Sequence, residues 1–171
     1  GAATSEFYVS DGYGNARVHK YSADGQLLLS WGERGNGPGQ FSISHSVRLD
    51  QQDRVWICDR ENNRVQIFDS NGNFLRAWNE LLRPNTIHFD PHEPVVYVAE
   101  LGRRLSIFAL DDEGYPGPML AQWADPTPSE TPGFWRGGPH GICTDAAGNL
   151  YVGEVELGVE GRMWKYQRER G

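Results

Sequence analysis

The chain of 171 residues carries a net charge of −7 and has 38% hydrophobic residues. The negative charge, with no stripe of Lys and Arg, argues against a nucleic-acid partner, and no apolar run approaches the roughly 20 residues that cross a bilayer. The abundance of glycine (21), proline (10) and tryptophan (6) favours short strands joined by turns over long helices. The length suits a single domain with a sizeable core, and the sequence leaves the compartment open.

An internal repeat organises the chain. Four apolar runs each end in an acidic residue, at Asp11, Asp59, Glu100 and Glu154, so that successive acids are 48, 41 and 54 residues apart. A period of roughly 40 to 50 residues is typical of propellers and similar arrays. We call these four residues the anchoring acids.

Each repeat unit predicts antiparallel strands in chain order. Apolar and polar residues alternate with a period of two, and "ADGQ", "SNGN" and "AAGN" supply glycine and asparagine for tight turns. A complete unit holds four strands, which predicts an all-β fold: a β-propeller of four-stranded antiparallel blades, about three and a half to four of them. The expected units of this single propeller (1–171) are 6–32, 45–79, 85–125 and 140–167.

The first and last units are each one strand short. The first unit begins at its second strand, "FYVSD", and the last stops at its third, "RMWKYQ". Unpaired strand edges invite association with another chain. We therefore expect a fragment of a longer propeller, a small four-bladed ring, or half of a homo-oligomer that forms through the incomplete terminal blades.

Three polar residues share one place in the repeat. When "SHSVRLD", "PNTIHFD" and "PHGICTD" are aligned on their closing aspartates, His45, Asn85 and His140 fall on the same position. That position starts the innermost strand of a blade, which lines the channel of a propeller. Imidazole is a common zinc ligand, so His45 and His140 are candidate metal ligands, and Asn85 is expected to line the channel. Alternatively, each histidine satisfies a backbone group where its strand begins.

Two further candidates stand in the turns that follow anchoring acids. Tyr13 lies between two glycines in "SDGYGNARV", and Arg60 follows Asp59 in "DRENN". A tyrosine in so small a turn either packs on a neighbour or reaches into a site. For Arg60, the alternative to a role in a site is a surface ion pair with Asp59 or Glu61, worth about 0 to 1 kcal/mol.

The cysteines and two aromatic residues have structural explanations. Cys58 and Cys143 lie in separate apolar runs, form no CxxC pair and are expected to be buried free thiols. Phe134 and Trp135, in the long segment "DPTPSETPGFWRGG", are either exposed anchors for a partner or packed under the loop.

Several segments together resemble a known family. "FYVSDGYGNARV", "SWGERGNGPGQFSISHSVRL", "CDRENNRVQIFD" and "GGPHGICTDAAGNLYVGEV" are similar to NHL-repeat propellers, and within them to the peptidyl-α-hydroxyglycine α-amidating lyase branch. The likeness is strongest over residues 7–68 and 139–155. It implies an NHL-type propeller.

The resemblance also implies an activity, that of a zinc-dependent carbon–nitrogen lyase of the peptidylamidoglycolate lyase type, which releases a peptide amide and glyoxylate. His45 and His140 would bind the zinc, which would bind the substrate's hydroxyl oxygen. Tyr13 would take the hydroxyl proton, and Arg60 would pair with the substrate carboxylate. The family's third zinc histidine has no counterpart in this chain, and Gly141 replaces a calcium-binding acid, so no calcium is expected.

Two functions stay open on the sequence. The first is a lyase-like propeller with a partial channel metal site, with the activity of this chain itself in question. The second is a non-catalytic NHL scaffold that binds a peptide or a protein on its loop face. The missing third histidine and the long loops favour the second, and the joint presence of Tyr13, His45, Arg60 and His140 favours the first.

Overall fold

The computed structural model describes residues 5–125, 127–131, 134–156 and 161–169, and nearly all of its regular structure is β-strand. In this part of the chain the one helical element is a short 3-10 helix, η1 (Arg60–Asn62). None of the described residues form a helix long and apolar enough to cross a membrane. The chain divides into two compact units, Gly1–Arg83 (unit 1) and Pro84–Gly171 (unit 2).

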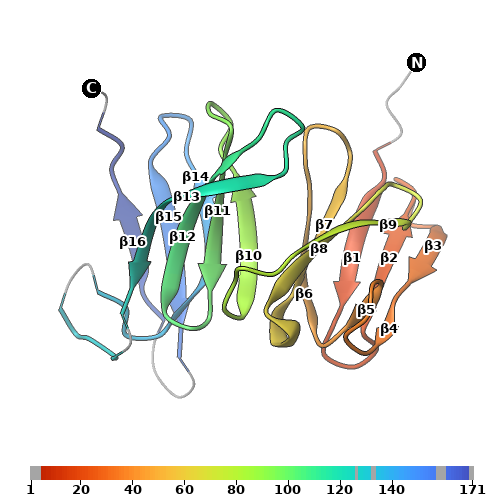
Figure 1. Cartoon of the computed structure of the whole chain (residues 1–171), viewed down its shortest axis with the longest axis horizontal. Helices are drawn as coiled ribbons and strands as arrows, with labels where there is room; N and C mark the ends of the chain where they lie inside the picture. Colours follow the sequence, from red (N-terminus) through yellow and green to blue (C-terminus); the bar gives the residue numbers. More distant parts are fainter. Residues whose placement is uncertain (1–4, 126, 132–133, 157–160, 170–171) are drawn as a thin grey trace. The chain divides into compact units, whose positions relative to one another are not determined.

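Unit 1 holds two antiparallel sheets (Figure 1). Blade 1 has three strands, β1 (Phe7–Asp11), β2 (Arg17–Tyr21) and β3 (Leu27–Trp31). Blade 2 has four strands, β6 (Ser44–Leu49), β7 (Val55–Asp59), β8 (Arg64–Phe68) and β9 (Phe74–Trp78). Between the blades, β4 (Glu33–Arg34) and β5 (Gln40–Phe41) form a short parallel pair.

Unit 2 also holds one four-stranded and one three-stranded antiparallel sheet, in the opposite order along the chain. Blade 3 has four strands, β10 (Pro84–Phe89), β11 (Val95–Glu100), β12 (Arg104–Leu110) and β13 (Pro116–Ala124). Blade 4 has three strands, β14 (Gly138–Thr144), β15 (Leu150–Val155) and β16 (Met163–Tyr166). The predicted all-β fold of antiparallel, four-stranded blades is confirmed. The expected loop 125–138 and last repeat unit include residues 126, 132–133 and 157–160, which lie outside the described residues.

An aspartate closes the hairpin turn between β14 and β15, the first two strands of blade 4. Asp145 Oδ1 accepts hydrogen bonds from the backbone N–H groups of Ala147 (3.0 Å) and Asn149 (2.9 Å). Gly148 in the same turn has φ = 81°, a value that favours glycine, as "AAGN" predicted. The hydrogen bond from the Asn149 side chain, together with these backbone bonds, lowers the pKa of Asp145 to about 2.

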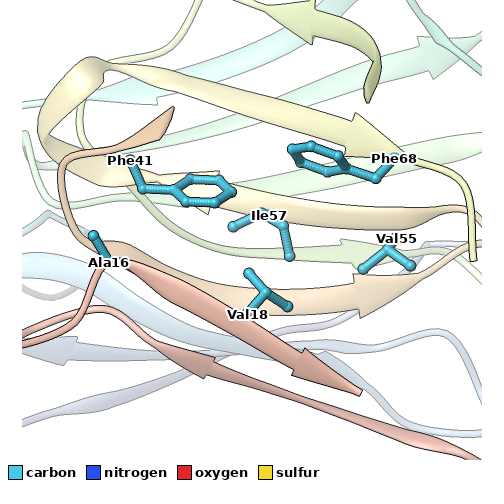
Figure 2. Close-up of a cluster of buried hydrophobic side chains, with 6 residues drawn as sticks. All are labelled: Ala16, Val18, Phe41, Val55, Ile57 and Phe68. Atoms are coloured by element: carbon cyan, nitrogen blue, oxygen red, sulfur yellow. The ribbon is translucent and has the colours of Figure 1, made fainter. Parts of the chain in front are cut away.

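A hydrophobic cluster joins the two blades of unit 1 (Figure 2). Figure 2 shows Val18 of blade 1 pointing toward Val55 and Ile57 of β7. Tyr8 and Trp31 of blade 1 pack against the same cluster. Alternate residues of one blade therefore meet alternate residues of the next, which fixes the position of β1 beside β6.

The core of unit 2 settles two expectations. Trp135 is buried in the cluster of blades 3 and 4, whereas Phe134 is 53% exposed. Of these two aromatic rings, that of Phe134 is therefore the one available to a partner. Cys58 is a buried free thiol, as expected, but the same expectation for Cys143 is wrong because its side chain is exposed. Residues of a strand alternate between faces, so Ile142 enters the core and Cys143 points away from it.

Candidate functional site

His45, Asn85 and His140 occupy equivalent positions in three blades. Each lies at an irregularity in the pairing of the first two strands of its sheet, directly after the residue that pairs with an anchoring acid. A bulge adds one residue to a strand and turns its side chain away from the regular alternation. The register on the closing aspartates predicted this equivalence, but no feature of the sequence indicated the bulges.

Gly12 places the Tyr13 turn directly on the start of β6. A Cβ atom at Gly12 would lie 2.2 Å from the carbonyl oxygen of Ser44, so only glycine fits there. Asn15 closes the turn with a hydrogen bond of 2.6 Å from its side-chain nitrogen to Asp11 Oδ2. The turn thereby brings Tyr13 beside His45, the residue that follows Ser44.

Tyr13, His45 and Arg60 come together in unit 1. Arg60 Nη1 donates a hydrogen bond of 3.0 Å to the Tyr13 hydroxyl oxygen, and the guanidinium carbon lies 5.4 Å from the ring centroid. The Tyr13 and His45 ring centroids are 6.0 Å apart, with the rings edge to face. Tyr13 is 71% exposed, whereas Arg60 is only 8% exposed. The structure therefore brings three of the predicted site residues together, at the end of blades 1 and 2 where the β1–β2 turn and η1 lie (Figure 1).

The carboxylate of Glu61, one of the ion-pair partners that the sequence suggested, fixes the position of the Arg60 side chain. Its Nε donates to Glu61 Oε1 at 2.8 Å, and Arg83 Nη2 donates to the same oxygen at 2.8 Å. The Arg83 hydrogen bond, and then that of Arg60, hold the pKa of Glu61 below its usual range. Arg83 is a member of the site that sequence reasoning missed, because it stands 22 residues from Glu61 in a segment without a recognisable motif.

A buried carboxylate supports the turn that carries Arg60. Asp59 is fully buried and accepts hydrogen bonds from the backbone of Ser42 (2.7 Å) and from the side chains of Arg64 (2.7 Å), Asn62 (2.9 Å) and Gln66 (3.1 Å). Among these four donors, Arg64 is the charged one, so Asp59 forms its ion pair with Arg64. The ion pair of the site arginine is therefore formed with Glu61, one of the two partners that the sequence offered.

In unit 2, Asn85 lies under the strand that carries His140. Asn85 is fully buried, and its Nδ2 donates a hydrogen bond of 2.9 Å to the carbonyl oxygen of Pro139. His140 itself is half-buried. The side chain of Asn85 thus satisfies a backbone group, and its contact with a substrate stays a prediction.

The described residues do not provide a complete metal-ligand set. Among the His, Cys, Asp and Glu side chains described, no group of three or more is placed to hold a metal ion. A catalytic zinc site needs three protein ligands in most enzymes. His45 belongs to unit 1 and His140 to unit 2, so neither unit supplies that number by itself. We therefore derive no catalytic step through a metal, and zinc binding by these histidines stays a prediction.

Comparison with known proteins places the chain in a class. Residues 43–68, which run from the start of β6 to the end of β8, match the NHL repeat. Virginiamycin B lyase from Staphylococcus aureus has the same fold, with a TM-score of 0.62 at 15% identity over 94% of this chain and 52% of that one. The chain thus contains an NHL repeat and has the β-propeller fold, as the sequence predicted.

Two sets of relatives are more specific. Human NHL repeat-containing protein 3 is 42% identical over 118 residues, which cover 65% of this chain and 34% of the human protein. Peptidyl-α-hydroxyglycine α-amidating lyase 2 from Drosophila melanogaster is 30% identical over 96% of this chain and 41% of the lyase. The chain is therefore homologous to both kinds of protein, and it spans about a third to two fifths of their length.

Proposed function

We propose that this chain carries the tyrosine–arginine part of a lyase active site that cleaves the C–N bond of a peptide ending in α-hydroxyglycine. The contact between Tyr13 and Arg60, with His45 beside them, is the observation that carries the proposal. The similarity to an amidating lyase along 96% of the chain supports it, since that alignment spans all three residues.

The reaction needs one proton to move between two atoms of the substrate. As the hydroxyl proton leaves, the carbon–oxygen bond becomes a carbonyl and the C–N bond breaks, with its electron pair passing to nitrogen. Nitrogen then takes a proton, which gives a peptide amide and glyoxylate. Tyr13 is placed to accept the hydroxyl proton and return it to nitrogen, as a general base and then a general acid. Arg60 donates a hydrogen bond to the Tyr13 hydroxyl oxygen and so holds that oxygen in position.

The same arginine can orient the substrate. Its Nε is occupied by Glu61, so the carboxylate of the hydroxyglycine would bind at the outer nitrogens, next to the Tyr13 oxygen. A planar guanidinium suits a carboxylate because two parallel hydrogen bonds fix its direction. Both the acid–base group and the substrate carboxylate would then be positioned by one buried side chain.

The test is release of glyoxylate from a synthetic peptidyl-α-hydroxyglycine by the purified chain in zinc-containing buffer. We expect Tyr13→Phe, which keeps the ring, to lower the rate by about 10²- to 10⁴-fold, the usual contribution of a general acid or base. Tyr21→Phe is the matched control, since Tyr21 pairs and stacks with Phe7 at the end of the β1–β2 hairpin opposite the Tyr13 turn. Release equal to the buffer background, or equal rates for wild type and Tyr13→Phe, would contradict the proposal.

A second candidate function rests on a different part of the surface. Phe134 is 53% exposed and Trp123 is 42% exposed, and both line a cavity of about 260 Å³ with Asp125. Exposed aromatic side chains are frequent anchors at binding surfaces. A non-catalytic propeller that binds a peptide or protein there is the alternative. Binding to a peptide array that is lost in Phe134→Ser, from a chain that releases no glyoxylate, would favour this function over the first.

A further inference from the structure

Ile43 has a backbone conformation that its side chain disfavours. Its φ angle is 67°, in the left-handed region, where the Cβ atom of an L-residue crowds the following carbonyl oxygen. A branched Cβ makes such a conformation an outlier, and Ile43 is the one β-branched residue with a positive φ angle in the described part of the chain. Strain of this kind persists where the surrounding contacts impose it, and it is often found at functional sites. Ile43 stands two residues before His45.

The contacts that impose this conformation run to η1. Arg60 N–H donates a hydrogen bond of 3.0 Å to the Ile43 carbonyl oxygen, and Glu61 N–H donates one of 3.0 Å to the Ser42 carbonyl oxygen. Two consecutive carbonyl groups therefore face two consecutive N–H groups. In an extended strand neighbouring carbonyl groups point in opposite directions, whereas a helical residue of either hand turns them to the same side. The left-handed turn at Ile43 thus lets both bonds form.

A buried carboxylate holds the residues on either side of Ile43. Ser42 N–H donates a hydrogen bond of 2.7 Å to Asp59 Oδ1, and Asp59 is fully buried directly before η1. Ser44 pairs with Asp59 in the register of β6 and β7. The segment on both sides of Ile43 is therefore attached to the end of β7 and to η1, which leaves its backbone little freedom.

The Tyr13 turn is attached to the same segment. It packs on Ser44, whose carbonyl oxygen would lie 2.2 Å from a Cβ atom at Gly12. Ser44 is the residue after Ile43, to which the backbone of Arg60 is bonded. The two partners of the Tyr13–Arg60 hydrogen bond therefore start from neighbouring residues of one segment.

We propose that Ile43 is a positioning residue of this site, and that its left-handed backbone sets the approach of Arg60 to Tyr13. The inference rests on the proposed function, because it concerns the same pair of side chains. Ile43 acts through its peptide group: the carbonyl oxygen holds the start of η1, and the side chain of Arg60 leaves from that point toward the Tyr13 hydroxyl. A different backbone conformation at position 43 would turn the start of η1, and with it the guanidinium, away from the Tyr13 turn.

The first test compares glycine with alanine at position 43. Ile43→Gly and Ile43→Ala both remove the side chain, but only glycine adopts a positive φ angle without steric cost. We expect the urea midpoint of Ile43→Gly to lie above that of Ile43→Ala. The matched control is the same pair of substitutions at Val47, which pairs with Ile57 within β6 and β7, and there glycine should be the less stable. Glycine less stable than alanine at both positions would overturn the proposal.

The second test follows Arg60 itself. Ile43→Pro cannot adopt a positive φ angle, because the proline ring fixes φ near −65°. In this variant we expect the Arg60 Nε–H signal in 15N NMR spectra to exchange quickly with water. Glyoxylate release should fall by about 10²-fold, the effect of a displaced catalytic geometry. Ile43→Asn should keep slow exchange and most of the activity, since asparagine takes the left-handed conformation readily.

The NMR signal separates this inference from the proposed function. Fast exchange in Ile43→Pro with slow exchange in Ile43→Asn supports the positioning role even if the wild-type chain releases no glyoxylate, a result that would contradict the lyase activity alone. A folded Ile43→Pro protein with the wild-type signal would overturn the role of Ile43. If Ile43→Pro does not fold, Ile43→Asn and Ile43→Gly decide the matter. Loss of the Arg60 signal in these two folded proteins, which keep the left-handed backbone, would overturn the role as well.

Discussion

Arg60 Nη1 lies 3.0 Å from the hydroxyl oxygen of Tyr13, and the same guanidinium sits 5.4 Å from the centroid of that ring. The buried arginine therefore contacts both the polar end and the π-face of a tyrosine that is 71% exposed. An exposed phenol on a turn has many accessible orientations, and these two contacts select one of them. The geometry of the proposed site thus depends on what holds Arg60.

Removing the carboxylate behind Arg60 should therefore impair the site without touching Tyr13. In Glu61→Ala, Arg60 loses the acceptor of its Nε–H and Arg83 loses its partner. A hydrogen bond to a charged group is worth about 1.5 to 3 kcal/mol, so we expect glyoxylate release to fall by about tenfold or more. Glu61→Gln keeps an acceptor oxygen and should lose less.

The direct measurement for this prediction is the Arg60 Nε–H signal in 15N NMR spectra. Its exchange with water should be slow in wild type, faster in Glu61→Ala and intermediate in Glu61→Gln. Arg83→Ala should produce a smaller change, since the Arg83 side chain bonds to Glu61 and not directly to Arg60. If the signal and the rate of release are both the same in Glu61→Ala as in wild type, Glu61 does not position Arg60.

The two glycines beside Tyr13 should differ in their tolerance of a methyl group. In Gly12→Ala the new Cβ would lie 2.2 Å from the Ser44 carbonyl oxygen, so the turn or β6 must shift, at a cost of about 1 to 3 kcal/mol. A Cβ at Gly14 meets nothing within 4 Å, so Gly14→Ala is the matched control and should unfold like wild type. Urea denaturation of the three proteins measures the difference, and equal midpoints for Gly12→Ala and Gly14→Ala would refute the steric role.

Much of the architecture could be predicted because it follows from local patterns of residues in the sequence. The period-two alternation identifies the strands, and the anchoring acids set the repeat that aligns His45 with His140. The same alternation shows why the expectation for Cys143 was wrong, since a residue within an apolar run still points to one of two faces. In blade 4, the face opposite the core is open.

The site was predictable only in part, because its remaining features depend on contacts distant in sequence. The requirement for glycine at position 12 comes from the backbone of Ser44, on the next sheet. Arg83 joins Arg60 through a carboxylate, and nothing in its own segment indicates that role. Bulges likewise depend on the pairing of two strands and leave no trace in the composition of either one.

Acid should weaken the β14–β15 hairpin turn through Asp145. The pKa of Asp145 in the folded chain is about 2, below the value of about 3.9 for an unfolded aspartate. Its contribution to stability is therefore complete above about pH 4 and is lost as the pH falls toward 2. We expect the difference in unfolding free energy between wild type and Asp145→Asn, measured by urea denaturation, to shrink over that interval. Asp112→Asn, an exposed aspartate in another turn, is the control. A difference independent of pH would contradict this assignment.

Zinc content gives the sharpest test of the histidine pair. If His45 and His140 are ligands, elemental mass spectrometry should find zinc on the wild-type chain, and His45→Ala and His140→Ala should each lose most of it. Because no group of three or more potential ligands is placed to hold a metal among the described residues, prolonged dialysis should also deplete the wild type of zinc. His88→Ala is the control, because His88 is engaged with the Thr144 hydroxyl at 2.8 Å. Zinc retained equally by all four proteins would remove both histidines from the metal hypothesis. The Tyr13–Arg60 contact would remain as the basis of the proposed site, because it needs no metal to form.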